Sequence, residues 1–124
     1  MRQILIATIA LLFIAAAAQA RVVTLNATVH DSQGNLVTGS HDVTIKVYAS
    51  ATGGSPVWAE FHSSVSFSSG QISLSAGSLS SAGIPDGCFD GSHYFTLSVS
   101  GIGITELEPR VNTLDNGATW TGFW

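Results

Sequence analysis

The sequence predicts an all-β fold, an antiparallel β-sandwich of about seven short strands. Three observations lead to this prediction. Apolar and polar residues alternate in several runs after residue 20, turn-forming residues separate these runs, and no run there has helical periodicity. The polar partners are mainly Ser and Thr, which suit the exposed face of a sheet, and two facing sheets bury the apolar faces of such strands.

The first twenty residues are predicted to be a secretory signal peptide. Arg2 gives a positive start, an apolar run extends from Ile4 to Ala18, and Ala18 and Ala20 occupy the small-residue positions before a cleavage site. The apolar run is short for a membrane span. We therefore expect a secreted protein, located outside the cell, on its surface or in the periplasm, without membrane insertion after cleavage. Its single domain would span residues 21–124.

Six alternating runs mark the expected strands. In chain order they span residues 23–29, 43–49, 57–67, 72–76, 95–99 and 104–107. Segments 31–35, 51–56 and 68–71, rich in Gly, Asp, Asn and Ser, separate the first four runs, and residues 78–92 form one long irregular segment. Short strands with regular turns are typical of an immunoglobulin-like or transthyretin-like sandwich.

The hairpin around residues 51–56 allows a specific register to be predicted. The register pairs, in order, Tyr48 with Trp58, Val47 with Ala59, Lys46 with Glu60, Ile45 with Phe61 and Thr44 with His62. An aromatic pair and a charge pair then share one face and apolar pairs share the other, and such cross-strand pairs stabilise a sheet. A slip of one residue would disrupt every pair. Tyr48 and Trp58 are therefore expected to point outward together.

Charged residues are few, and acidic residues outnumber basic ones. Eight Asp and Glu stand against four Lys and Arg, a formal net charge of −4, and without Arg2 the remaining chain has three cations and a net charge of −5 (3 − 8). A basic patch for nucleic acid or for an anionic membrane surface is absent. The expected partners are other proteins, further copies of the chain, or a glycan.

The sequence contains no catalytic signature, and we expect a protein that is not an enzyme and needs no cofactor. Serines are abundant, but no G-x-S-x-G elbow occurs. Cys88 is the single cysteine, so a disulfide framework is excluded. Burial of this thiol is the favoured expectation, and a free thiol or pairing between subunits is the alternative.

The histidines were considered as metal ligands. His30 and His41 would lie at one end of the sandwich, near Asp31 and Asp42, if the first two strands formed a hairpin. His93 would join them only if the long irregular segment returned to that end. Zinc sites bring ligands at short fixed spacings, and none is present. Solvated side chains at strand ends are the preferred interpretation, and no metal is expected.

A set of short motifs runs through the chain in a characteristic order. They are a Gly34–Gly39 turn, a strand ending in Tyr48, a Gly53–Gly54 hairpin with Trp58 and Glu60, the segment Gly70–Gly77, then Phe89, Gly91, Tyr94 and Pro109–Arg110. This order resembles a small β-sandwich domain of bacterial secreted and cell-surface proteins of fibre or adhesin type. The resemblance implies a non-catalytic extracellular module for display or assembly.

The aromatic residues are the candidate binding and interface residues: Tyr48, Trp58, Trp120, Phe123 and Trp124. An outward Tyr48–Trp58 pair would stabilise the hairpin, anchor a protein interface or stack on a sugar ring. The tail, residues 118–124, has two alternatives: it closes the core of its own domain, or it adds a strand to a neighbour's sheet. The expected function is therefore a structural or assembly module of a surface appendage or extracellular matrix, with a small carbohydrate-binding protein as the alternative.

Overall fold

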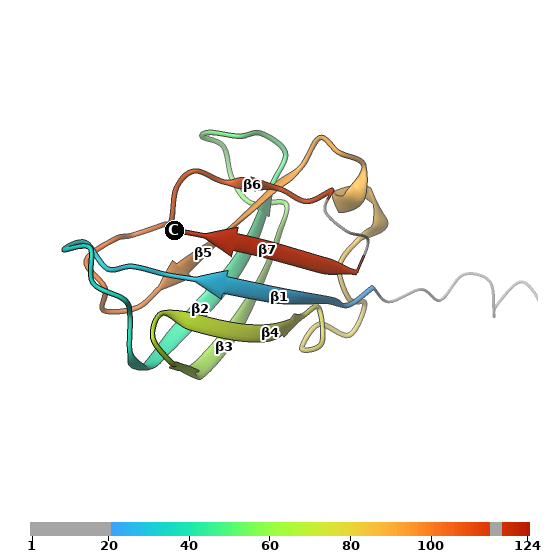
Figure 1. Ribbon diagram of the computed structural model, residues 1–124. Coiled ribbons are helices and arrows are strands. Elements are labelled where there is room, and N and C mark those ends of the chain that lie inside the picture. Colours follow the sequence, from blue (N-terminus) through green and yellow to red (C-terminus); the bar gives the residue numbers. More distant parts are fainter. Residues whose placement is uncertain (1–20, 115–117) are drawn as a thin grey trace, which may run out of the picture.

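The computed structural model describes residues 21–114 and 118–124, which form two facing β-sheets (Figure 1). The predicted signal peptide lies outside these described residues. The elements are β1 (Val23–Thr28), β2 (Gly39–Tyr48), β3 (Trp58–Phe67), β4 (Gln71–Ala76), the 3-10 turn η1 (Asp86–Phe89), β5 (Tyr94–Val99), β6 (Val111–Asn112) and β7 (Thr119–Phe123). The predicted all-β sandwich of about seven strands is confirmed.

The strand order is β4-β1-β7 in one sheet and β3-β2-β5-β6 in the other. All neighbouring strands are antiparallel except β1 and β7, which run parallel. Figure 1 shows β3 and β4 along one side of the sandwich and β6 and β7 along the other. Among the described strands, each sheet therefore has two outer strands with a free side: β4 and β7 in one sheet, β3 and β6 in the other.

The core lies between the sheets and consists of the alternating apolar residues. Its strand residues include Val23, Leu25, Ala27, Val43, Ile45, Val47, Phe95, Leu97 and Val99, all buried. Period-two alternation places these side chains on one face of each strand, so β1, β2 and β5 were predicted in the correct phase. Cys88, at η1, is also buried among them, as expected for an inert thiol.

The aromatic tail closes the core of its own domain. Strand β7 pairs with β1, and Trp120 is 0% exposed. Its ring stacks on Phe95 at 4.7 Å between centroids and lies 5.6 Å from Phe89, while Nε1 donates a hydrogen bond of 2.9 Å to the carbonyl of Thr113. The first of the two alternatives for residues 118–124 is therefore the one observed.

The predicted hairpin register is wrong by one residue. Trp58 lies opposite Val47, and the next pairs are Ala59 with Lys46, Glu60 with Ile45, Phe61 with Thr44 and His62 with Val43. Trp58 and Glu60 consequently face the interior, whereas Phe61 faces outward and is 56% exposed. Tyr48 lies on the opposite face of the sheet from Trp58, so the outward aromatic pair does not form.

A bulge in β3 explains the error. Between His41 and Val43 of β2 there is one residue, but between their partners Val65 and His62 there are two. The extra residue reverses the phase of the strand. Ser64 has a φ of 52° there, and its amide donates to Asp42 Oδ1 at 2.9 Å. The predicted phase is correct for Phe67, which is buried, and fails on the other side of the bulge.

The expected strand at residues 104–107 is also wrong. Residues 101–110 form an irregular loop over the outer face of β2 and β5, where Leu107 is buried. The Leu107 amide donates to the Leu97 carbonyl at 3.0 Å, and its carbonyl accepts from Thr96 Oγ1 at 2.6 Å. One backbone and one side-chain hydrogen bond, rather than a strand ladder, attach Leu107 to β5.

We expect Trp120→Ala to lower the free energy of unfolding by about 3–5 kcal/mol, because a large buried ring is removed from between the sheets. Phe123→Ala is the matched control, since this ring of the same strand is 72% exposed, and its effect should stay within about 0.5 kcal/mol. Urea denaturation of both variants measures the difference. Equal effects would contradict a core role for Trp120.

Candidate functional site

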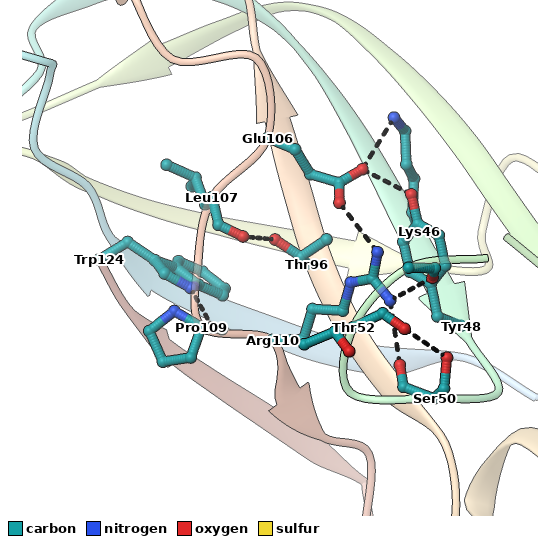
Figure 2. Close-up of polar contacts among 11 residues, drawn as sticks. Lys46, Tyr48, Ser50, Thr52, Thr96, Glu106, Leu107, Pro109, Arg110 and Trp124 are labelled. Carbon is teal, nitrogen blue, oxygen red and sulfur yellow. Dashed lines mark hydrogen bonds and ion pairs between the residues drawn. The ribbon is translucent and has the colours of Figure 1, made fainter. Parts of the chain in front are cut away.

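A polar cluster centred on Glu106 lies on the outer face of β2 (Figure 2). Glu106 Oε2 accepts hydrogen bonds from Lys46 Nζ, at 3.2 Å, and from the Tyr48 hydroxyl. The guanidinium of Arg110 lies 3.4 Å above the Tyr48 ring and 3.4 Å from Glu106 Oε1. Its Nη1 also donates to the carbonyls of Ser50 and Gly53, at 3.0 and 2.9 Å. The cluster thus joins the loop 101–110 to the hairpin at 51–56.

The protonation of this cluster follows from its contacts. Burial of the Glu106 carboxyl raises its pKa, but the hydrogen bonds from Tyr48 and Lys46 lower it by more, so the pKa lies below its ordinary value. Burial and the Glu106 carboxylate raise the pKa of Tyr48. A protonated phenol and an ionised carboxylate are therefore held together at neutral pH. Both groups serve to fix the loop on the sheet.

A second cluster surrounds Glu60, which is 5% exposed on the inner face of β3. Its carboxylate accepts from the amides of Gly77 (2.9 Å) and Leu79 (3.1 Å) and from Ser80 Oγ (2.9 Å), and His62 Nε2 lies 2.7 Å from Oε1. Burial raises the pKa of Glu60, but these hydrogen bonds lower it by more, to below its ordinary value. Glu60 thus anchors the segment after β4 to β3.

These two clusters explain several of the motif positions noted in the sequence. Tyr48 and Arg110 contact Glu106, and Arg110 also donates to the carbonyl of Gly53. Glu60 binds the amide of Gly77. Although they lie far apart in the sequence, these residues attach loops to strands. The motif is therefore a set of structural contacts in this chain, and the sequence alone did not indicate the role of Glu106.

The histidines do not form a metal-binding group within the described residues. Strands β1 and β2 belong to different sheets, so the hairpin that would unite His30 and His41 does not form. His41 contacts the carbonyls of Ser100 and Thr38 through its two ring nitrogens, and His30 contacts the carbonyl of Trp124. Within residues 21–114 and 118–124, no group of three or more His, Cys, Asp or Glu is arranged to hold a metal ion.

Asp90, Ser92 and His93 lie close together but lack the geometry of a catalytic relay. Asp90 Oδ1 accepts from the Ser92 amide and hydroxyl and lies 2.9 Å from His93 Nδ1, and these contacts lower the pKa of Asp90 to about 2. Ser92 Oγ is 3.4 Å from that same Nδ1. A relay needs the histidine to bridge the hydroxyl and the carboxylate through its two different nitrogens. The cluster instead closes a turn.

Of the five predicted site residues, only Phe123 is fully on the surface. Tyr48 and Trp120 are buried, Trp58 and Trp124 are half-buried against the core, and Phe123 is exposed. The sugar-stacking surface expected from Tyr48 and Trp58 is thus absent. Trp124 packs edge-on against Phe95, and its Nε1 donates to the Pro109 carbonyl at 2.8 Å (Figure 2).

Phe123 lies at the corner of an uncharged face on the three-stranded sheet. The outward side chains form three rows across β4, β1 and β7: Ser75–Thr24–Thr119, Ser73–Asn26–Thr121 and Gln71–Thr28–Phe123. An open hollow of about 550 Å³ lies here, lined among others by Asn26, Gln71, Thr121 and Phe123. This face presents hydroxyl and amide groups beside one exposed aromatic ring.

On the other sheet, the outer strand β3 carries an exposed aromatic side chain. This strand is ten residues long, and Phe61, near its middle, is 56% exposed. A long outer strand with exposed apolar residues is a template for pairing with another chain. Sequence reasoning missed this residue because the incorrect register placed Phe61 in the core.

No helical segment in the described part of the chain has the length and apolar character needed to cross a membrane. Comparison with known proteins identifies one family model, described as "Domain of unknown function (DUF8740)", which matches residues 24–110. No curated protein and no solved structure matches the chain. The matched region includes both polar clusters and β3, and it ends before β7.

We expect Glu60→Gln to destabilise the protein by about 1–3 kcal/mol at pH 7, because an amide presents a donor to groups that themselves donate. The folded-state pKa of Glu60 lies below 4.5, so the stability that its carboxylate provides is complete above pH 4.5 and is lost as pH falls through the lowered value. The difference between wild type and Glu60→Gln should therefore shrink as the pH falls from about 5 to 3.

Urea denaturation across this pH range measures the effect. Glu108→Gln is the matched control because Glu108 is exposed, and its difference from wild type should be small at every pH. A Glu60→Gln difference that stays constant with pH would contradict the role of the ionised carboxylate.

Proposed function

The chain belongs to the DUF8740 family, whose description assigns no function, and we propose that it is an exported, non-catalytic structural or assembly module. Its setting would be a bacterial surface appendage or an extracellular matrix, as the resemblance of its motifs to fibre and adhesin domains implies. The observation that carries the proposal is the free edge of β3, with its exposed Phe61. Such an edge forms main-chain hydrogen bonds to another strand.

The polar residues of the chain support a structural function. Glu60 lies in β3, and its donors belong to the segment after β4. Glu106 lies in the loop 101–110, and its donors Lys46 and Tyr48 belong to β2. Both carboxylates thus attach an irregular segment to a sheet. Their ionised state is fixed by these contacts, whereas a general acid–base catalyst needs a pKa near the working pH. These carboxylates are suited to holding loops in place.

The low charge also favours association. The chain after residue 20 carries five more acidic than basic groups (8 − 3), so copies repel one another only weakly and salt screens this repulsion. The secreted location, predicted from residues 1–20, would place the free edges where other extracellular proteins are encountered.

We expect the purified protein to self-associate, with a mass above that of one chain at millimolar concentration. Because like charges oppose association, added salt should shift the equilibrium toward the assembled form. Size-exclusion chromatography with light scattering, over micromolar to millimolar concentrations and at two salt concentrations, measures this. A strictly monomeric protein under all these conditions would count against self-assembly.

Carbohydrate binding at Phe123 is the second candidate function. The observation that favours it is the uncharged face around this ring, where the amides of Asn26 and Gln71 and the hydroxyl of Thr121 line the same hollow. Aromatic faces stack on apolar sugar faces, and neutral amides and hydroxyls bond to sugar hydroxyls. This surface replaces the Tyr48–Trp58 pair as the candidate for such a ligand.

For this candidate we expect wild-type protein to bind neutral oligosaccharides on a glycan array, and Phe123→Ala to lose the signal. Phe61→Ala is the control, since it removes a comparably exposed ring from the other sheet. A blank array for wild type, or equal binding by Phe123→Ala, would eliminate the candidate.

A further inference from the structure

We propose that β3 binds the β3 strand of a second copy of this chain, antiparallel and with a two-fold axis at Phe61. The inference rests on the proposed assembly function, because it names the partner and the surface that assembly would use. The two four-stranded sheets would then join into one continuous sheet across the dimer.

The direction of the backbone groups along β3 can be deduced from two hydrogen bonds that β2 accepts. The Val57 amide donates to the Val47 carbonyl, and the Ser100 amide donates to the Asp42 carbonyl. Backbone groups alternate in direction along a strand. Val43, Ile45 and Val47 therefore face β3, and Asp42 faces β5.

The same alternation applies to the partners of these residues. Trp58, Glu60 and His62 lie opposite Val47, Ile45 and Val43, so the backbone groups of these three β3 residues point toward β2. The N–H and C=O groups of Ala59 and Phe61 consequently point to the free edge. Both residues also turn their side chains outward, away from the core.

The free edge is complementary to itself about Phe61. An antiparallel pair centred there places Phe61 opposite Phe61 of the second copy, and the backbone N–H and C=O groups that each residue directs to the free edge bond to each other. Ala59 then meets Ser63, and Glu60 meets His62. The outer face thus combines an aromatic pair with two small, uncharged pairs. On the inner face, the imidazole that contacts Glu60 of its own chain comes next to Glu60 of the second copy. The aromatic pair is a favourable cross-strand combination, and the small pairs bring no like charges together.

Exposed apolar side chains gather along this side of the sandwich. Phe61 is accompanied by Val57, 52% exposed, at the start of the strand. Leu79, 63% exposed, lines a hollow with His62, Val65 and other residues between the edges of β3 and β4. A second copy paired with β3 would remove part of this apolar surface from water, which adds to the main-chain hydrogen bonds.

The other outer strands are less suited to pairing. β6 has two residues, too few for a ladder. The outward side chains of β4 are Gln71, Ser73 and Ser75, without an apolar anchor. β7 has five residues, and its only outward apolar side chain is Phe123, at its end. β3 carries its aromatic residue within the segment before the bulge, with further strand residues on both sides of it, rather than at the end of the strand.

The first test compares two lysine substitutions in the purified full-length chain. Phe61→Lys places like charges opposite each other at the two-fold axis, and we expect it to weaken self-association at least tenfold in sedimentation equilibrium. Phe123→Lys introduces the same charge at the other exposed phenylalanine and should leave the association constant unchanged. Urea denaturation verifies that both variants are folded.

The second test uses cysteine cross-linking to read the register. Residues opposite each other have Cα atoms about 5.5 Å apart, within the range of a disulfide, so Phe61→Cys alone should form a covalent dimer under mild oxidation. Ser63→Cys alone should not, since the two copies of residue 63 are offset by about 13 Å. A mixture of Ala59→Cys and Ser63→Cys chains should form the mixed disulfide. The parent chain, with its buried Cys88, is the control.

The outcomes separate this inference from the proposed function. If wild type self-associates but Phe61→Lys associates equally well, the β3 interface is wrong and the assembly function stands. If wild type is monomeric and Phe61→Cys forms no cross-link, both fail. Cross-linking of Ser63→Cys alone at the rate of Phe61→Cys would also overturn the two-fold register.

Discussion

The contact between Trp120 and Phe95 is the one on which the sandwich depends. Phe95 lies in the middle of the four-stranded sheet's inner face, and Trp120 comes from the outer strand of the opposite sheet. Their stacked rings connect the two layers across the core. Strand β7, near the C-terminus, pairs in parallel with β1. Figure 1 shows it on the same side of the sandwich as β6. The C-terminal residues, beyond the region matched by the family model, are therefore an integral part of this chain's core.

Two of the few charged groups, Glu60 and Glu106, attach irregular segments to strands. An isolated buried carboxylate is costly unless donors surround it. Glu60 meets this condition by binding amides and a hydroxyl of the segment after β4. Glu106, in the loop 101–110, meets it by binding Lys46 and Tyr48 of β2. In each cluster the carboxylate attaches a loop to a strand, and the same contacts provide the hydrogen-bond donors that the carboxylate needs. This reciprocity explains how a chain rich in Gly and Ser, with long irregular segments, keeps those segments in place.

Local patterns in the sequence predict most of the fold and little of the surface. Alternation identified β1, β2, β4 and β5 and the sandwich architecture, since those strands obey period two throughout. It failed in β3, where the bulge at Ser63 and Ser64 reverses the phase, and no residue type announces a bulge unambiguously. The error moved Phe61 into the core and Glu60 out of it. The incorrect register therefore hid both the exposed aromatic residue of β3 and the buried carboxylate that anchors the segment after β4. The Glu106 cluster was missed for a different reason, because its contacts span some sixty positions of sequence.

The bulge that made the register prediction wrong also limits the length of β3 that can pair with a partner strand. A long, free edge invites indefinite pairing with many registers. In β3 the straight segment begins after Pro56 and ends at the bulge, where Ser64 has left-handed backbone and is bonded to Asp42. Only the short segment from Trp58 to Ser63 remains available to a partner. A strand of that length, with one central aromatic residue, favours a single two-fold register. A two-fold pair uses the same edge of both copies and leaves none of it free, so that it forms a closed dimer. Any larger assembly would have to use a different surface, such as the uncharged face around Phe123 on the other sheet.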